Sequence, residues 1–181
     1  MKVLLLMIIL TTLTACSTVS KYHHKVEKSN SPIVKFSCDL KGKVIIDSVI
    51  ELSSQNIKNC FQNKDKVLWL RYWVPYCGDN STELELLKKY SERIELVWIA
   101  VLWDYKTIRQ QIEATNYPVY YLDRELPKNR IKAVNAFSRQ LVKSNCDQFS
   151  SNLFIKNGQL LHQCYTNSKL ESVVDSLMLK N

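Results

Sequence analysis

Cysteine is the residue type in this chain whose chemistry is most informative. Cys77 lies between an apolar run and an amphipathic helix, in the segment YWVPYCGDN that ends at Asn80. At a helix N-terminus, free backbone N–H groups and the helix dipole stabilise a thiolate and so lower the pKa of a cysteine. The negative charge of Asp79, two residues later, opposes that effect. Cys77 is therefore predicted to be the reactive thiol.

The first sixteen residues have the features of an export signal that ends in a lipidation site. Lys2 precedes an apolar run over residues 3–10, which is too short to span a bilayer as a mature helix. The end of the signal, LTAC, resembles the lipobox of bacterial lipoproteins. That resemblance implies cleavage before Cys16 and acylation of its thiol with fatty acids such as palmitate. An uncleaved membrane-anchoring helix is the alternative.

The signal defines the expected domain organisation and the compartment. Residues 1–15 are predicted to be the signal peptide, residues 16–32 the lipidated cysteine and a flexible tether, and residues 33–181 one domain. By analogy with bacterial lipoproteins, Ser17 favours the outer membrane, so the domain would be lipid-anchored in the cell envelope and face the periplasm. Disulfides persist in such an oxidising compartment.

Six cysteines become five once Cys16 is assigned to the anchor, and five is an odd number. At least one thiol must then be free, reactive or paired with another chain. In one arrangement Cys38 pairs with Cys60 and Cys146 with Cys164, which leaves Cys77 free. In the other, Cys146 or Cys164 approaches Cys77 and acts as a resolving thiol. Connectivity does not follow from sequence, so both arrangements stay open.

The elements that must position Cys77 alternate between apolar runs and helical periods. The expected strands cover residues 33–38, 43–52, 67–73, 95–103, 118–122, 153–155 and 159–164, with a turn over 40–42 joining the first two. The expected helices cover residues 79–93, 107–115, a segment opened by Pro127, and 170–179. The dipeptide Asn157-Gly158 is typical of a tight hairpin turn. The chain is predicted to form an α/β fold with a central mixed sheet flanked by helices.

The segment around Cys77 resembles the active-site turn of the thioredoxin superfamily, with Cys77 at the nucleophile position. Residues 95–103, the short helix after them and Tyr117-Pro118-Val119 are similar to the insertion of the TlpA/ResA-type envelope oxidoreductases. Residues 152–160 resemble the closing hairpin of thioredoxin, which is followed by a last helix. The resemblance covers about Ile33 to Leu179 and implies a thioredoxin-like fold, thiol-disulfide chemistry and a substrate groove walled by Trp73, Tyr76 and Ser150.

Two residues depart from the pattern of that family. Asn80 stands where a second cysteine would displace the mixed disulfide. Ser150 stands where the family has a cis-proline beside the nucleophile, and a non-proline residue favours the trans form by about 2.5–4 kcal/mol. These departures leave two functions open. One is atypical thiol-disulfide exchange through Cys77 with envelope protein thiols or disulfides. The other is a redox-inactive binding or assembly module.

Composition excludes other classes of function. The hydrophobic content of 46% and the charged content of 23% are those of a globular domain. The net charge of +8 favours anionic lipid headgroups or acidic envelope partners, and the export signal argues against a nucleic-acid partner. No zinc spacing, Gly-rich phosphate loop or paired carboxylates occur, so neither a metal site nor a cofactor is predicted.

Overall fold

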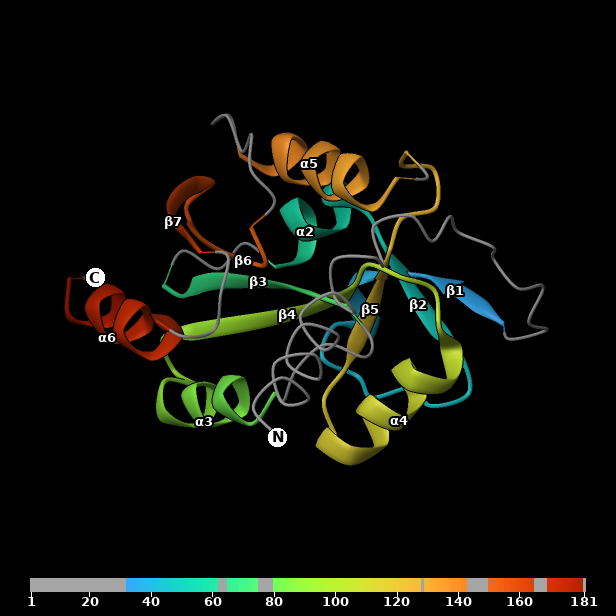
Figure 1. Ribbon diagram of the computed structural model, residues 1–181, viewed down its shortest axis with the longest axis horizontal. Coiled ribbons are helices and arrows are strands. Elements are labelled where there is room, and N and C mark those ends of the chain that lie inside the picture. The colour runs from blue at the N-terminus through green and yellow to red at the C-terminus, as the bar shows by residue number, and fades with distance from the viewer. Residues whose placement is uncertain are drawn as a thin grey trace, which may run out of the picture.

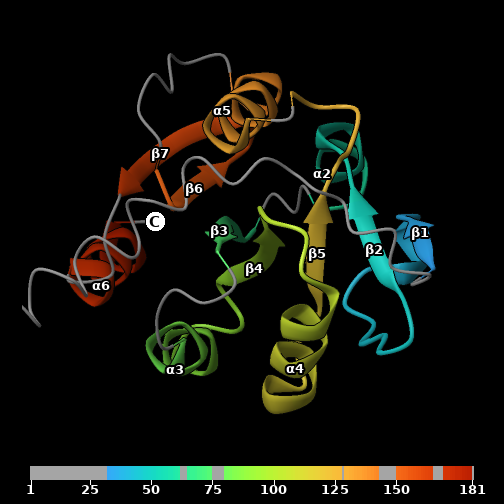
Figure 2. The same cartoon turned by 45° about the vertical axis from the view of Figure 1, so that its right-hand side comes forward.

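The computed structural model describes residues 32–61, 65–74, 80–127, 129–142, 150–164 and 169–180. Within these ranges, seven strands form one sheet in the order β1-β2-β5-β4-β3-β6-β7 (Figure 2). The strands are β1 (Ile33–Lys35), β2 (Val49–Leu52), β3 (Val67–Trp73), β4 (Ile94–Ala100), β5 (Val119–Leu122), β6 (Asn152–Lys156) and β7 (Gln159–Cys164). The four neighbouring pairs β1–β2, β2–β5, β5–β4 and β4–β3 are parallel, whereas β6 is antiparallel to both β3 and β7. The sheet is therefore mixed.

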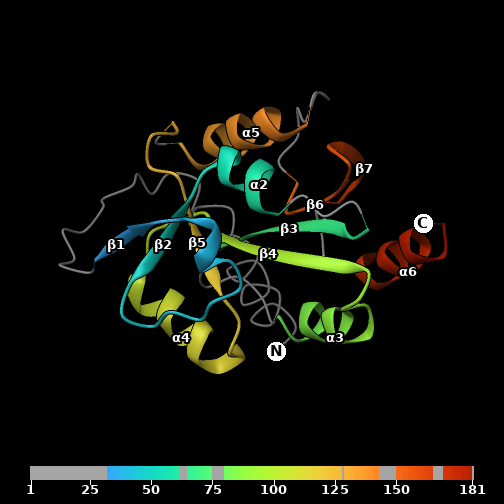
Figure 3. The same cartoon turned by 180° about the vertical axis from the view of Figure 1, so that it is seen from behind.

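Helices cover both faces of the sheet. They are α2 (Ser54–Cys60), α3 (Ser81–Lys89), α4 (Tyr105–Thr115), α5 (Arg130–Leu141) and α6 (Leu170–Lys180), with a short 3-10 helix η2 (Cys38–Leu40) near the start. Views from the front and from behind place α2 and α5 on one face and α3, α4 and α6 on the other (Figures 1 and 3). This is the α/β arrangement predicted from the sequence, a mixed sheet flanked by helices with a closing hairpin and a last helix.

Strand β3 lies at the centre of this arrangement. All seven of its residues, VLWLRYW, are buried, as expected for a strand that is covered on both faces. It pairs with β4 from Val67 to Trp73 and with β6 from Leu68 to Arg71. Because side chains alternate along a strand, Leu68, Leu70 and Tyr72 face α2 and α5 while the odd-numbered residues face α3, α4 and α6.

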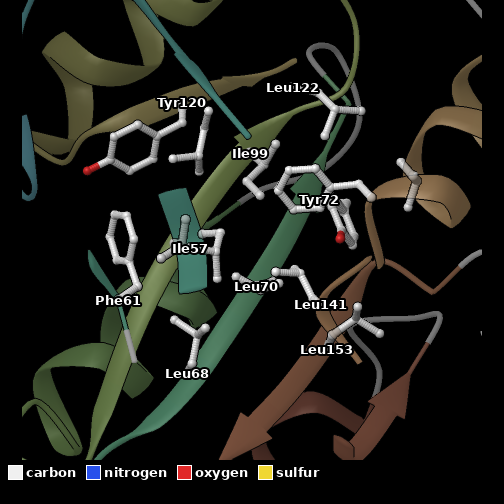
Figure 4. Packing of buried hydrophobic residues seen from close by; sticks show 14 of the residues in the cluster. Ile57, Phe61, Leu68, Leu70, Tyr72, Ile99, Tyr120, Leu122, Leu141 and Leu153 are labelled. Atoms are coloured by element: carbon white, nitrogen blue, oxygen red, sulfur yellow. The ribbon is translucent and has the colours of Figure 1, made fainter. Parts of the chain in front are cut away.

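The face under α2 and α5 holds a continuous apolar core. Figure 4 shows Leu70 and Tyr72 of β3 packed among side chains from neighbouring strands and helices, such as Ile99 and Leu141. The Tyr72 hydroxyl reaches α5, where it lies 2.9 Å from Ser138 Oγ. The one buried hydroxyl of this part of β3 therefore has a partner.

The opposite face holds two separate apolar clusters. One surrounds Trp69, which stacks on Phe154 with ring centroids 5.4 Å apart, and it packs against α3 and α6. The other surrounds Trp73 and Trp98, whose rings are 6.2 Å apart, and it packs against α4. In β3, the residue between Trp69 and Trp73 on this face is Arg71.

The structure corrects the expectation for the N-terminal part of the domain. The segments containing Ile33 and Val49 were expected to be strands joined by the 40–42 turn, but β1 and β2 are short and run parallel. Residues 38–40 form η2, and β2 starts only at Val49. The helix α2 was not predicted at all, although Ser53 and Asn56 form a capping box at its start.

Helix starts also differ from the expected positions. Helix α4 begins at Tyr105 rather than Thr107, because Asp104 caps it by accepting a hydrogen bond from Thr107 N at 3.1 Å. Helix α5 begins at Arg130, since Asn129 serves as its cap in place of a start at Pro127.

A disulfide joins Cys38 of η2 to Cys60 of α2, with their Cα atoms 5.4 Å apart. This confirms one of the pairings considered from the sequence.

We expect the double variant Cys38→Ala/Cys60→Ala to lose about 2–4 kcal/mol of unfolding free energy, because the crosslink restricts the unfolded chain. Urea unfolding followed by circular dichroism would measure the loss. Adding a reductant should destabilise the wild type by a similar amount and leave the double variant unchanged. Equal stability of the two proteins would contradict the prediction.

Candidate functional site: the C-terminal end of strand β3

The structure describes some of the predicted site residues and not others. The described ones are Trp73, Asn80, Ser150 and Cys164. Those outside the described residues are Cys16, Tyr76, Cys77 and Cys146. The predicted site can therefore be built from the elements that enter and leave residues 75–79, namely β3 and α3, and from the neighbouring strands β6 and β7.

Two buried residues stand at the ends of the connection that contains Cys77. Trp73 ends β3 and is 3% exposed. Asn80 precedes α3 in the N-cap position, but its side chain forms no capping hydrogen bond. Although Asn80 is only 7% exposed, its Oδ1 has no hydrogen-bond partner in the described structure, and neither does Trp73 Nε1. Both ends of the connection thus carry buried groups with unused hydrogen-bonding capacity.

Ser150 lies beside the end of β3. The register pairs Arg71 with Asn152, and Tyr72 N donates to Ser151 O at 2.8 Å. Pairing continued by one more residue brings Ser150, which is buried, level with Trp73. The structure therefore brings together two of the residues predicted to wall the groove.

Cys164 carries a free thiol at the end of β7. The pairing of Cys164 with Cys146 that the sequence left open stays a prediction, because Cys146 lies outside the described residues. Counting back from the hairpin turn predicts that Cys164 lies opposite Ser151, but its partner is Asn152. The reason is a register shift in β7, where Leu161 is an extra residue between the pairs of Ile155 and Phe154. The shift places Cys164 and Asn152 on one face.

A buried ion pair lies on the same face. Arg71 Nε donates to Glu83 Oε1 of α3 at 2.8 Å, and the two side chains are 8% and 0% exposed. Arg71 Nη1 also donates to Tyr72 O at 3.2 Å. Next to Arg71 in the sheet, Asn152 Oδ1 accepts from Trp69 Nε1 at 3.0 Å. A polar layer therefore separates the two apolar clusters under α3, α4 and α6.

The polar layer extends to the thiol of Cys164. Arg71, Asn152 and Cys164 occupy paired positions on three adjacent strands, so their side chains share one face. Burial raises the pKa of the Cys164 thiol, while the positive charge of Arg71 and a hydrogen bond with Asn152 partly offset that rise. Cys164 is thus a protonated thiol at neutral pH that has a cation nearby.

Sequence reasoning missed Arg71, Glu83 and Asn152. One signal was present, because Arg71 is the only charged residue in an otherwise apolar strand. A buried strand tolerates such a charge only when it is paired. The partner could not be identified, since Glu83 in the first turn of a helix has a sufficient local explanation in the helix dipole.

The described residues show neither a metal site nor a membrane span. No cluster of three or more His, Cys, Asp and Glu side chains in this part of the chain could hold a metal ion. Among the described helices, none has both the length and the apolar character needed to cross a membrane.

We expect Arg71→Met to lower the unfolding free energy by about 3–5 kcal/mol, because it leaves the Glu83 carboxylate buried without its cation. The matched control is Arg109→Met, which removes the arginine of an exposed Arg109–Glu113 pair with the same 2.8 Å Nε–Oε1 distance. That change should cost no more than about 1 kcal/mol. Chemical unfolding of both variants tests the difference, and similar losses would contradict it.

We also expect Cys164 to react with iodoacetamide at a higher pH in the folded protein than in the unfolded chain, because burial raises its pKa and the thiolate is the reacting form. The measurement uses a Cys77→Ser/Cys146→Ser variant, in which Cys164 is the one free thiol outside the signal region. Mass spectrometry follows alkylation against pH, with and without urea. A folded-state midpoint at or below that in urea would contradict the assignment.

No family model matches the chain, and no curated protein matches it significantly. Among solved structures, a thioredoxin-like protein from Parabacteroides distasonis is 11% identical, with a TM-score of 0.46 over 80% of this chain and 99% of that one. The C-terminal domain of a candidate thiol-disulfide oxidoreductase from Bacteroides thetaiotaomicron is 13% identical, with a TM-score of 0.46 over 84% of this chain and 100% of that one. A candidate protein disulfide isomerase from the same species is 19% identical, with a TM-score of 0.43 over 65% of this chain and 76% of that one. At these identities the likeness concerns the fold alone.

Proposed function

We propose that the protein exchanges thiols and disulfides with envelope proteins through Cys77, as a lipoprotein anchored at Cys16 and facing the periplasm. The fold supports this proposal, because the chain enters residues 75–79 from a buried strand and leaves them into a helix, where a thiol is activated. The lipobox-like LTAC sequence supports the anchor and the compartment.

The observation that carries the exchange function is the free thiol of Cys164 near the end of β3. Cys164 lies two strands from β3, a separation of about 10 Å. From Trp73 to Cys77 the chain can extend by as much as about 13 Å. The chain length therefore allows the two thiols to meet, which supports Cys164 as a resolving thiol in place of the cysteine that Asn80 replaces. Cys146 and an external thiol are the other candidates for this role.

The proposed reaction balances in two steps. The Cys77 thiolate attacks one sulfur of a substrate disulfide, forms a mixed disulfide and releases the other sulfur as a thiolate, which takes up a proton. The resolving thiol then loses its proton and attacks Cys77 Sγ, which releases the second substrate thiol. The substrate disulfide is reduced by two electrons, and the two protein thiols are oxidised to a disulfide. An external dithiol reductant restores the starting state.

A second function is favoured by Asn80. Its buried side chain occupies the resolving position without forming a cap, which is consistent with a domain that binds a partner and carries out no exchange. In this alternative the end of β3 is a binding surface of a redox-inactive assembly module. The two functions differ in the reactivity of Cys77.

We expect Cys77→Ser to remove the fast reaction of the detergent-solubilised, full-length protein with Ellman's reagent, a small aromatic disulfide, and to leave only the slower reaction of other free thiols such as the half-buried Cys164. Cys164→Ser is the matched variant: it should still form the mixed disulfide at Cys77 but should accumulate it. Absorbance of the released thiolate and intact mass measure both effects. If the Cys77→Ser variant reacts as fast as the wild type, or if wild-type Cys77 has a pKa near 8.5 and does not react, the binding module replaces the exchange function.

A further inference from the structure

The buried Arg71–Glu83 ion pair contributes little net stability to the fold, because its desolvation cost offsets the attraction between the charges. Both side chains are buried, and removing two charges from water costs several kcal/mol per ion, which their attraction offsets only with good geometry. Apolar residues of similar volume often serve as well or better. The pair also interrupts what would otherwise be one apolar layer between the Trp69 and Trp73 clusters. Its position therefore calls for an explanation other than stability.

The pair joins the two elements that flank residues 75–79. Arg71 is two residues before the end of β3, and Glu83 is in the first turn of α3. Their bond, at 2.8 Å, fixes the start of the helix against the end of the strand. The additional bond from Arg71 Nη1 to Tyr72 O fixes the guanidinium on its own strand. The separation of the two ends of the connection is thus set by a directional contact rather than by apolar packing alone.

The same guanidinium acts on the opposite side of β3. Asn152 is the partner of Arg71 in β6, and Cys164 is the partner of Asn152 in β7. The other ionisable groups on the elements around Cys164 are His162 on β7, which is exposed, and Lys169, Glu171 and Asp175 at or on α6. Of these, Asp175 bonds to Lys89 and Tyr90 at the α3 side of the helix. Arg71 is the cation whose charge favours the Cys164 thiolate.

We propose that Arg71 is a positioning residue for thiol exchange: through Glu83 it holds the end of β3 against the start of α3, and through Asn152 it lies on the same face of the sheet as Cys164. This inference rests on the proposed function. The same buried guanidinium then acts on Cys77 through the position of the strand and helix ends, and on Cys164 through its positive charge.

The test compares apolar replacement of the buried pair with the same replacement of an exposed pair. In Arg71→Met/Glu83→Leu no charge is left unpaired, so we expect the domain to remain folded. The rate at which Cys77 reacts with Ellman's reagent should fall below the wild-type rate, because the end of β3 and the start of α3 lose the directional contact that joins them. The control, Arg109→Met/Glu113→Leu on α4, should react at the wild-type rate. Circular dichroism and thermal melting verify the fold of both variants.

A second readout separates positioning from stability. In the Cys77→Ser/Cys146→Ser background, the pH midpoint of Cys164 alkylation should move upward when Arg71→Met/Glu83→Leu removes the cation. Arg71→Lys with Glu83 retained should leave this midpoint close to its original value. The same Arg71→Lys change should still lower the rate at which Cys77 reacts with Ellman's reagent, because an ammonium lacks the planar fork that bonds to both Glu83 and Tyr72 O. If the double variant does not fold, Arg71→Lys provides the test.

The outcomes are distinguishable from failure of the proposed function. If wild-type Cys77 does not react, the exchange function is wrong, and the inference about Arg71 falls with it. If wild-type Cys77 reacts but the folded double variant, or Arg71→Lys in its place, retains the wild-type rate, the inference alone is wrong. An unchanged Cys164 midpoint in the folded double variant likewise overturns the electrostatic part. A slower Cys77 with a raised Cys164 midpoint supports both parts.

Discussion

Strand β3 is the element on which the rest of the structure depends, because it is fixed in every direction. It pairs with β4 along its whole length and with β6 along its second, third, fourth and fifth residues, and both of its faces are buried. A strand held in this way cannot slip by one residue without turning every side chain to the other face. The depth of Arg71 in the sheet and the point at which the chain leaves after Trp73 are therefore set together.

The two faces of β3 serve different purposes. The face under α2 and α5 is a continuous apolar core, in which the one polar group of β3, the Tyr72 hydroxyl, meets Ser138. The other face is divided by the layer that contains Arg71, Glu83 and Asn152. Bulk burial thus stabilises the domain from one side, while directional contacts define the other side. Geometry for chemistry is expected on a face of the second kind, because ion pairs and hydrogen bonds fix orientation in a way that apolar contacts do not.

Much of the fold followed from local sequence, and the parts that did not are those that depend on distant residues. The apolar run of β3 and the Asn157-Gly158 turn were sufficient to predict the central strand and the hairpin, and both turn residues have positive φ. Helix α2 was missed because seven residues of mixed polarity show no clear period. The register shift at Leu161 left no signal in the hydrophobic pattern. Because of this shift, Cys164 pairs with Asn152 and not with Ser151, its partner in a regular hairpin.

The candidate site shows the same division. Cys77 and Cys164 were predicted from residue type, and Cys77 lies outside the described residues, whereas the structure shows a free thiol at Cys164 and one of the considered pairings, Cys38–Cys60. The partners that surround Cys164 were not identifiable, since Arg71 and Asn152 become neighbours only when β6 is added to β3. An ion pair between a strand and the following helix also requires the tertiary fold. A residue's chemistry can be read from its type, but its environment depends on the topology.

The order of strands in the sheet also affects the order in which contacts form during folding. The Cys38–Cys60 bridge spans 22 residues, and strands β3 and β4 are neighbours both in the chain and in the sheet. By contrast, Trp69 meets Asn152 across 83 residues, so the layer that receives Cys164 needs a long loop to close. Contacts of long sequence separation cost more chain entropy and slow folding. A chain that folds from its N-terminus can therefore bring Cys38 and Cys60 together before Cys164 reaches the sheet, so the bridge can form while Cys164 is still distant from it.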